Sequence, residues 1–177
     1  MAIRRKYIRR VVDDVLHTNG VVDPPVPVDD IARRYKIRIK SQTFEGDISG
    51  YLFRRSGNVT IGVNQNHSLL RRRFTIAHEL GHFLLHPEGV DEVHVDRRFV
   101  IKLRSDQSSL GTNEHEVEAN LFAAELLMPT ELIRRDLFQQ HSVDLIEDDV
   151  ATKLAQRYKV SEQAMLFRLA NLGHISI

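Results

Sequence analysis

Apolar residues recur every three or four positions along much of this 177-residue chain, and this spacing predicts amphipathic helices. The predicted helices cover residues 7–16, about 31–35, 68–86, 113–128, 130–140 and, as a pair, 148–172. Start and stop signals support these limits: Asn19-Gly20 follows the first helix, Ser68 can cap the long one, and Pro87 and Pro129 each end a helix. Between residues 37 and 63 the spacing of apolar residues is different.

The segment from residue 37 to residue 63 has the spacing of strands. Ile37 and Ile39 alternate with charged residues, which is typical of a half-buried strand. The stretches 48–54 and 58–63 flank Arg55-Ser56-Gly57 and predict a hairpin. A further strand is expected around 99–103. The predicted fold is therefore α+β, with a small antiparallel sheet of about three strands packed beside the long helix and further helices.

Composition and charge narrow the classes of protein. The chain holds 25 Lys and Arg against 24 Asp and Glu, so its formal charge of +1 excludes bulk attraction to nucleic acid or acidic lipid, although a local patch remains possible. It has no Cys, which excludes disulfides, thiolate metal sites and a Cys nucleophile. No apolar run is long enough for a signal peptide or a membrane span, so a cytoplasmic location is expected.

The segment His78-Glu79-Leu80-Gly81-His82 carries the clearest chemistry in the chain. Two histidines four positions apart project from one face of a helix, so both imidazoles can reach one zinc ion at about 2.0–2.1 Å. Glu79 lies about 100° around the helix, where its carboxylate can take a proton from a water on the metal. Gly81 costs a helix roughly 1 kcal/mol, and its missing side chain lets another backbone or a substrate come close. The segment predicts a hydrolytic zinc site with Glu79 as the base.

Zinc needs a third protein ligand, and the helix predicted at 113–128 offers one. His86 lies too far along its own helix to reach the same ion, and we expect it to interact with the dipole at the helix end. Glu116 and Asn120 share a helix face, so Glu116 can bind the metal while the Asn120 amide oxygen accepts the outer N–H of a ligating histidine. Glu118 is the main alternative ligand, and a capping box with Asn113 is the alternative role for Glu116.

Two stretches of the chain together resemble the ImmA/IrrE metallo-endopeptidases. The likeness rests on residues 73–82 and 116–129 and extends to 26–28, 48–51, 158–161 and 172–173. These enzymes are gluzincins, zincin-like peptidases whose third ligand is the Glu of a Glu-x-x-x-Asp or Glu-x-x-x-Asn motif. The resemblance therefore implies one Zn²⁺ held by His78, His82 and Glu116, with Asn120 behind a histidine. Other gluzincins place Asp there, so the neutral Asn120 should enhance histidine basicity less.

The resemblance also implies a function, a zinc-dependent endopeptidase that cleaves a helix-turn-helix repressor or a similar protein partner. A first alternative is a regulatory module that keeps the fold and the zinc but binds the repressor without cutting it. A second is a DNA-binding regulator that uses the C-terminal helices. Direct nucleic-acid binding is not expected, because the last helix begins with Glu162 and Gln163 and has a single later cation, Arg168.

Two details of the predicted enzyme stay open. Residues 1–145 are expected to form the peptidase-like domain, and residues 146–177 a helix-turn-helix-like extension packed on it. Such sites usually have a second group that stabilises the oxyanion, and Tyr51, His94 and His115 are the candidates. An exposed edge of the hairpin could hold an extended substrate by β-augmentation.

Overall fold

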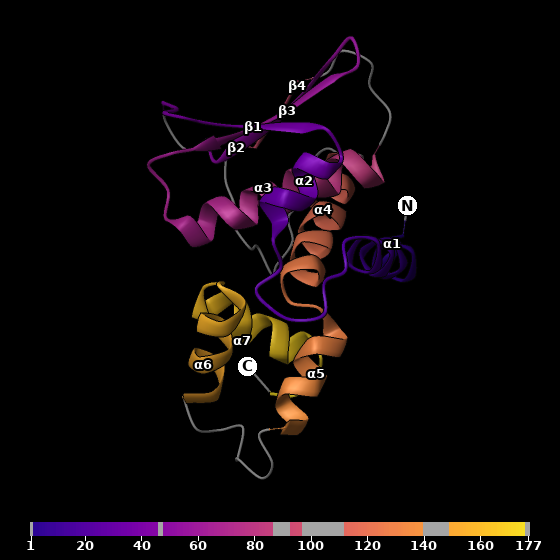
Figure 1. The fold of residues 1–177 in the computed structure, drawn as a ribbon, viewed down its shortest axis with the longest axis vertical. Helices are drawn as coiled ribbons and strands as arrows, with labels where there is room; N and C mark the ends of the chain where they lie inside the picture. Colours follow the sequence, from indigo (N-terminus) through magenta and orange to yellow (C-terminus); the bar gives the residue numbers. More distant parts are fainter. Residues whose placement is uncertain (1, 46–47, 87–92, 97–111, 140–148, 176–177) are drawn as a thin grey trace.

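The computed structural model describes residues 2–45, 48–86, 93–96, 112–139 and 149–175. Seven helices and four strands lie in these ranges (Figure 1). The helices are α1 (Arg5–Thr18), α2 (Val28–Arg34), α3 (Leu69–Leu85), α4 (Thr112–Leu127), α5 (Thr130–Gln139), α6 (Asp149–Tyr158) and α7 (Glu162–Asn171). The strands are β1 (Ile37–Gln42), β2 (Gly50–Arg55), β3 (Asn58–Asn64) and β4 (Val93–Asp96). None of the helices described is both long and apolar enough to cross a membrane.

Local sequence explains where α3 and α7 begin, and the predicted helices are confirmed to within a few residues. Ser68 caps α3 by accepting a hydrogen bond from the Arg71 backbone N–H, and Ser161 caps α7 in the same way. The strand expected around 99–103 lies outside the described residues.

The α+β class is confirmed, but the sheet differs from the expectation in two details. It has four described strands in the order β1-β3-β2-β4, and β1 runs parallel to β3. The hairpin makes β2 and β3 antiparallel, and β4 pairs antiparallel with the other edge of β2. The strand β3 is therefore antiparallel to its hairpin partner β2 and parallel to β1 on its other edge. Alternating polarity predicts strands but carries no information on their order.

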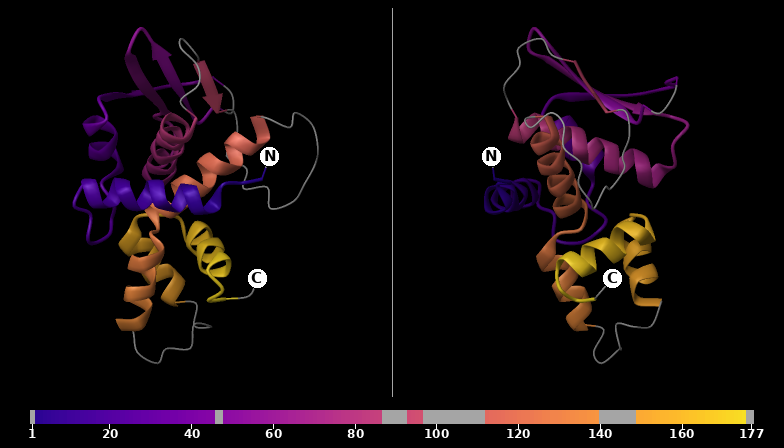
Figure 2. Two further views of the ribbon diagram at one scale, coloured as in Figure 1. Left: turned by 90° about the vertical axis from the view of Figure 1, so that its right-hand side faces the viewer. Right: turned by 180° about the vertical axis from the view of Figure 1, so that it is seen from behind.

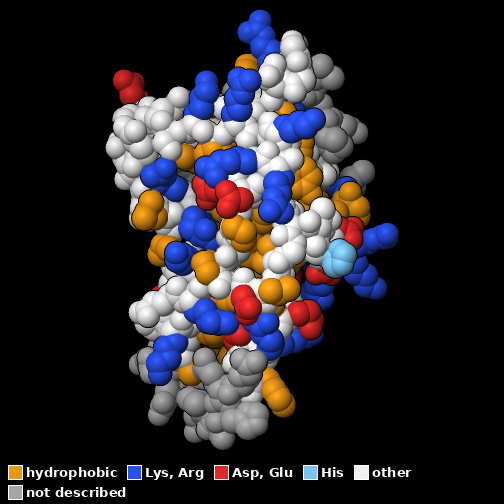
Figure 3. Space-filling view, viewed as in Figure 1, with side chains coloured by type: hydrophobic (Ala, Val, Ile, Leu, Met, Phe, Trp, Pro, Cys, Tyr) orange, Lys and Arg blue, Asp and Glu red, His pale blue; other side chains and the backbone are white. Residues whose placement is uncertain are grey.

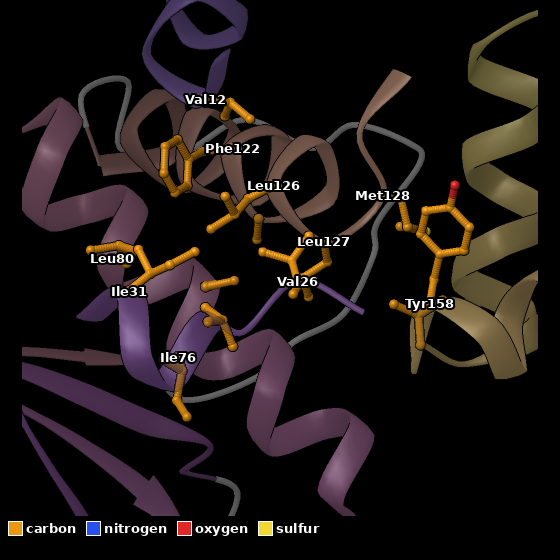
Figure 4. Close-up of a cluster of buried hydrophobic side chains, with 14 of the residues drawn as sticks. Val12, Val26, Ile31, Ile76, Leu80, Phe122, Leu126, Leu127, Met128 and Tyr158 are labelled. Atoms are coloured by element: carbon orange, nitrogen blue, oxygen red, sulfur yellow. The ribbon is translucent and has the colours of Figure 1, made fainter. Parts of the chain in front are cut away.

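One face of the sheet packs on α3, and α4 packs on the other side of that helix (Figures 1 and 2). The apolar side chains of α3 and α4, including Leu80, Phe122 and Leu126, lie in one buried cluster (Figure 4). A Cβ on Gly81 would lie 3.0 Å from a Phe122 ring carbon and 3.2 Å from both the Cα and the carbonyl oxygen of Ala119. The missing side chain of Gly81 therefore sets how closely the two helices approach.

The last helices are held to the rest by one buried ion pair and by buried hydrogen bonds. Arg168 of α7 lies 2.7 Å from the Glu125 carboxylate and donates hydrogen bonds to the Thr130 hydroxyl and the Met128 carbonyl. Tyr158 of α6 donates its hydroxyl to Asp136, and burial raises the pKa of that phenol. The division of the chain at residue 145 stays a prediction.

Candidate metal centre

Three predicted ligands meet between α3 and α4. The ligand atoms of His78, His82 and Glu116 all lie within 4.8 Å of one another. The Nε2 atoms of the two histidines are 3.0 Å apart, and the Glu116 carboxylate oxygens lie 3.4 Å from His78 Nε2 and 3.2 Å from His82 Nε2. Both imidazoles are buried, whereas Glu116 is partly exposed. This group could hold a metal ion, and Glu116 is its most exposed member.

Asn120 determines which nitrogen of the His78 imidazole carries the proton. Its amide oxygen lies 3.1 Å from His78 Nδ1, and an amide oxygen can only accept, so Nδ1 carries the proton. In a neutral imidazole the other nitrogen, Nε2, then presents a lone pair. That lone pair faces His82 Nε2 and the Glu116 carboxylate, which are themselves metal-ligating groups. Two imidazoles and one carboxylate converging in this way fit the donor set of a zinc site.

Glu79 follows His78 in α3 and faces the sheet. Its side chain is completely buried, and a Cβ placed on Gly50 would lie 3.7 Å from Glu79 Oε1. The same Cβ would overlap the Thr75 methyl group, so β2 can approach α3 only because residue 50 is glycine. The close packing of strand and helix therefore buries the Glu79 carboxylate next to Gly50 of β2, one residue along α3 from His78.

Glu118, the alternative ligand, has a different role in the structure. Its carboxylate accepts hydrogen bonds from the Arg4 backbone N–H and from the Arg4 guanidinium, at 2.9 to 3.1 Å for the N–H and Nε. These bonds lower the pKa of Glu118 to about 2. His86 Nε2 lies 3.1 Å from the same carboxylate, and burial lowers the pKa of His86. Glu118 and His86 are thus engaged with each other and with Arg4, and neither belongs to the metal-ligating group.

The end of α3 is capped by two cations that sequence reasoning missed. Arg54 of β2 donates to the carbonyl oxygens of His82, Phe83 and His86, and Arg4 donates to that of Leu85. These guanidiniums donate hydrogen bonds to the last carbonyl groups of the helix. The sequence predicted that His86 would interact with this helix end, but its imidazole pairs with Glu118. No local spacing could have identified them, because they reach α3 from elsewhere in the chain.

The structure separates the three candidates for the oxyanion-stabilising group. Tyr51 follows Gly50 in β2, so its side chain leaves the sheet on the face opposite α3, and its ring lies over Gly62. This position argues against Tyr51. His115 is exposed and stacks on His86 with ring centroids 4.0 Å apart. The side chains of His94 and Asn113 lie outside the described residues.

Comparisons with known proteins extend these observations. The model of the Peptidase_M78 family, described as the IrrE N-terminal-like domain, matches residues 32–170. A relative named uncharacterized immunity region protein 2, from Bacillus phage phi105, is 28% identical over 122 residues, which are 69% of this chain and 68% of that protein. A solved structure described as a Mycobacterium tuberculosis transcriptional regulator superposes with a TM-score of 0.63 at 14% identity. The superposition covers 93% of this chain but only 46% of the regulator, so this chain spans less than half the regulator's length, and the likeness is one of fold.

Proposed function

Because the chain belongs to the Peptidase_M78 family of IrrE N-terminal-like domains, we propose that it is a zinc-dependent endopeptidase acting in the cytoplasm. The observation that carries this proposal is the convergence of His78, His82 and Glu116, whose ligand atoms lie within 4.8 Å of one another. The bond between Asn120 and His78 supports it, because it directs the lone pair of a neutral imidazole toward that point.

Each residue of the site has a distinct task in peptide hydrolysis. His78, His82 and Glu116 would hold the ion and leave one position open for water and substrate. Zinc, when bound, supplies Lewis-acid polarisation of the scissile carbonyl and makes water more acidic. Glu79 takes the proton from the attacking water and passes it to the leaving amine.

For the substrate we propose a helix-turn-helix repressor. The resemblance to the ImmA/IrrE peptidases supports this class, and so does the relative named for a phage immunity region. A module that binds such a repressor without cutting it would keep the same metal-ligating group, so only an assay of cleavage separates the two. The DNA-binding alternative lacks support, because Arg168, the one cation of α7, is buried against Glu125.

The test compares Glu79→Gln with the wild type, using a helix-turn-helix repressor as substrate. Glu79→Gln should keep one zinc ion per chain by elemental analysis and lose cleavage by at least a hundredfold, since general base catalysis contributes about 10²–10⁴. Equal cleavage by both proteins would exclude Glu79 as the base. Binding of the repressor by both, with no fragments from either, would favour the non-cutting module.

Metal analysis of a matched pair tests the ligands. Glu116→Ala should lose most of its zinc, whereas Glu118→Ala should retain it, because Glu118 is held by Arg4. Zinc retained in Glu116→Ala and lost in Glu118→Ala would reverse the assignment.

A further inference from the structure

The sheet has two faces of opposite character, and the peptidase proposal uses only one. Leu52, Ile61 and Val63 point toward α3 and are buried. The alternate positions point away from α3, to a face on which no described helix lies (Figures 1 and 2). We call this second surface the outer sheet face, and it consists of residues 38, 40, 42, 51, 53, 55, 58, 60 and 62.

Strand pairing arranges the outer sheet face in two similar rows. In the first row Phe53 of β2 lies opposite Thr60 of β3, which lies opposite Arg38 of β1. In the second row Tyr51 lies opposite Gly62, and Gly62 lies opposite Lys40. Each row therefore holds an aromatic ring, a small residue and a cation, with the ring and the cation about 10 Å apart across two strand spacings.

The aromatic ring of Tyr51 lies flat on the sheet. A Cβ built on Gly62 would overlap three carbons of that ring, so the glycine makes room for it. Tyr51 and Phe53 are both half-buried, and Tyr51 also contacts Phe44 edge to face with ring centroids 5.7 Å apart. The two rings lie in adjacent rows and are partly exposed, so planar ligands can stack on them.

The charged residues among the positions that define the outer sheet face are all cations. Arg38, Lys40 and Arg55 are exposed, and none of the outer-face positions of β1, β2 and β3 is Asp or Glu. Among the described residues neither Arg38 nor Lys40 has an ion-pair partner. Figure 3 shows Lys, Arg, Asp and Glu side chains over one side of the molecule, in the view of Figure 1.

We propose that the outer sheet face binds single-stranded nucleic acid. Cations can contact the phosphates while the rings of Tyr51 and Phe53 stack on unpaired bases, the combination found where single strands lie on a sheet. A duplex would leave the rings unused, because its bases are already stacked on one another. An acidic peptide would need the cations but not the rings. The net charge of +1 hid this surface, because the balancing carboxylates lie elsewhere in the chain.

The test measures fluorescence anisotropy of a short labelled oligodeoxythymidine strand over a series of salt concentrations. Arg38→Gln/Lys40→Gln should weaken binding at least tenfold at low salt and reduce the salt slope by about 1.4, at about 0.7 per phosphate contact. The control Arg5→Gln/Arg10→Gln removes the same charge from two exposed positions of α1 and should change binding less than twofold. Phe53→Leu keeps an apolar side chain without a ring and should weaken binding about fivefold or more at an unchanged salt slope.

The possible results are distinct. No binding by the wild type at low salt would overturn the proposal, as would equal affinity for a duplex of the same length. Equal weakening by the control pair would show attraction to charge in general and would also overturn it. Unchanged affinity in Phe53→Leu, with polyglutamate competing as well as the oligonucleotide, would assign the surface to acidic peptides instead. Thermal unfolding of each variant checks that the sheet is intact, and none of these results bears on the peptidase activity.

Discussion

Replacement of Gly81 by alanine tests whether the approach of α3 to α4 governs metal binding. The new Cβ would lie 3.0 to 3.2 Å from Phe122 and from the backbone of Ala119, closer than ordinary van der Waals contact. Overpacking of this kind costs about 1–3 kcal/mol, while alanine recovers about 1 kcal/mol of helix propensity. The free energy of unfolding without metal should therefore fall by at most about 2 kcal/mol. Because α4 must move by a few tenths of an ångström, the carboxylate of Glu116 moves away from the two histidines.

Metal affinity should respond more strongly than stability. Metal–ligand distances tolerate errors of about 0.2 Å, so we expect zinc affinity to fall at least tenfold. Urea denaturation in the presence of a chelator gives the stability, and competition with a chromophoric chelator gives the zinc affinity. A more stable Gly81→Ala protein with zinc affinity within twofold of the wild type would refute the idea that this glycine sets the geometry of the site.

Three further predictions follow from contacts of the same helices. Asn120→Ala should lower zinc affinity by about 10- to 100-fold, whereas Asn120→Asp should bind zinc at least as tightly as the wild type. The same chelator competition measures both affinities. Arg4 lowers the pKa of Glu118 from 4.5 to about 2, so the wild type should be more stable than Glu118→Gln above pH 4.5. Urea titrations should show this difference in stability shrinking as the pH falls toward 2. A difference that does not change with pH would contradict the pairing of Arg4 with Glu118. Arg168→Met should lower the free energy of unfolding by about 3–5 kcal/mol, because it leaves the Glu125 charge buried without its partner. Adding Glu125→Gln to the same chain should recover much of that loss. Additive losses in the double variant would exclude an interaction between the two residues.

The sequence predicted those parts of the site whose residues are close neighbours along a helix. His78 and His82, and likewise Glu116 and Asn120, are four positions apart, so helical periodicity alone places each pair on one face. The small residue at Gly81 correctly indicated a close approach by another backbone, which proved to be that of Ala119. The catalytic role of Glu79 and the identity of the metal remain predictions.

The features that the sequence did not predict depend on contacts between distant segments. Nothing near Glu118 indicates that Arg4 will bind it, and nothing near Arg54 indicates that it will cap α3. The parallel pairing of β1 with β3 has the same cause, since strand order follows from the path of the chain and not from the pattern within a strand. The outer sheet face was hidden for a related reason: its rows of side chains exist only once three strands are in register.

The hydrogen bond between Arg4 and Glu118 joins residues 114 positions apart. Translation produces α1 first, then both histidines, and only much later the helix that carries Glu116 and Glu118. Until α4 emerges from the ribosome, α1 lacks the carboxylate that anchors it, and His78 and His82 lack the third member of the metal-ligating group. Contacts of such long sequence separation form slowly because a large loop must close first. A nascent chain should therefore acquire tight zinc binding late, in the same step that secures its first helix.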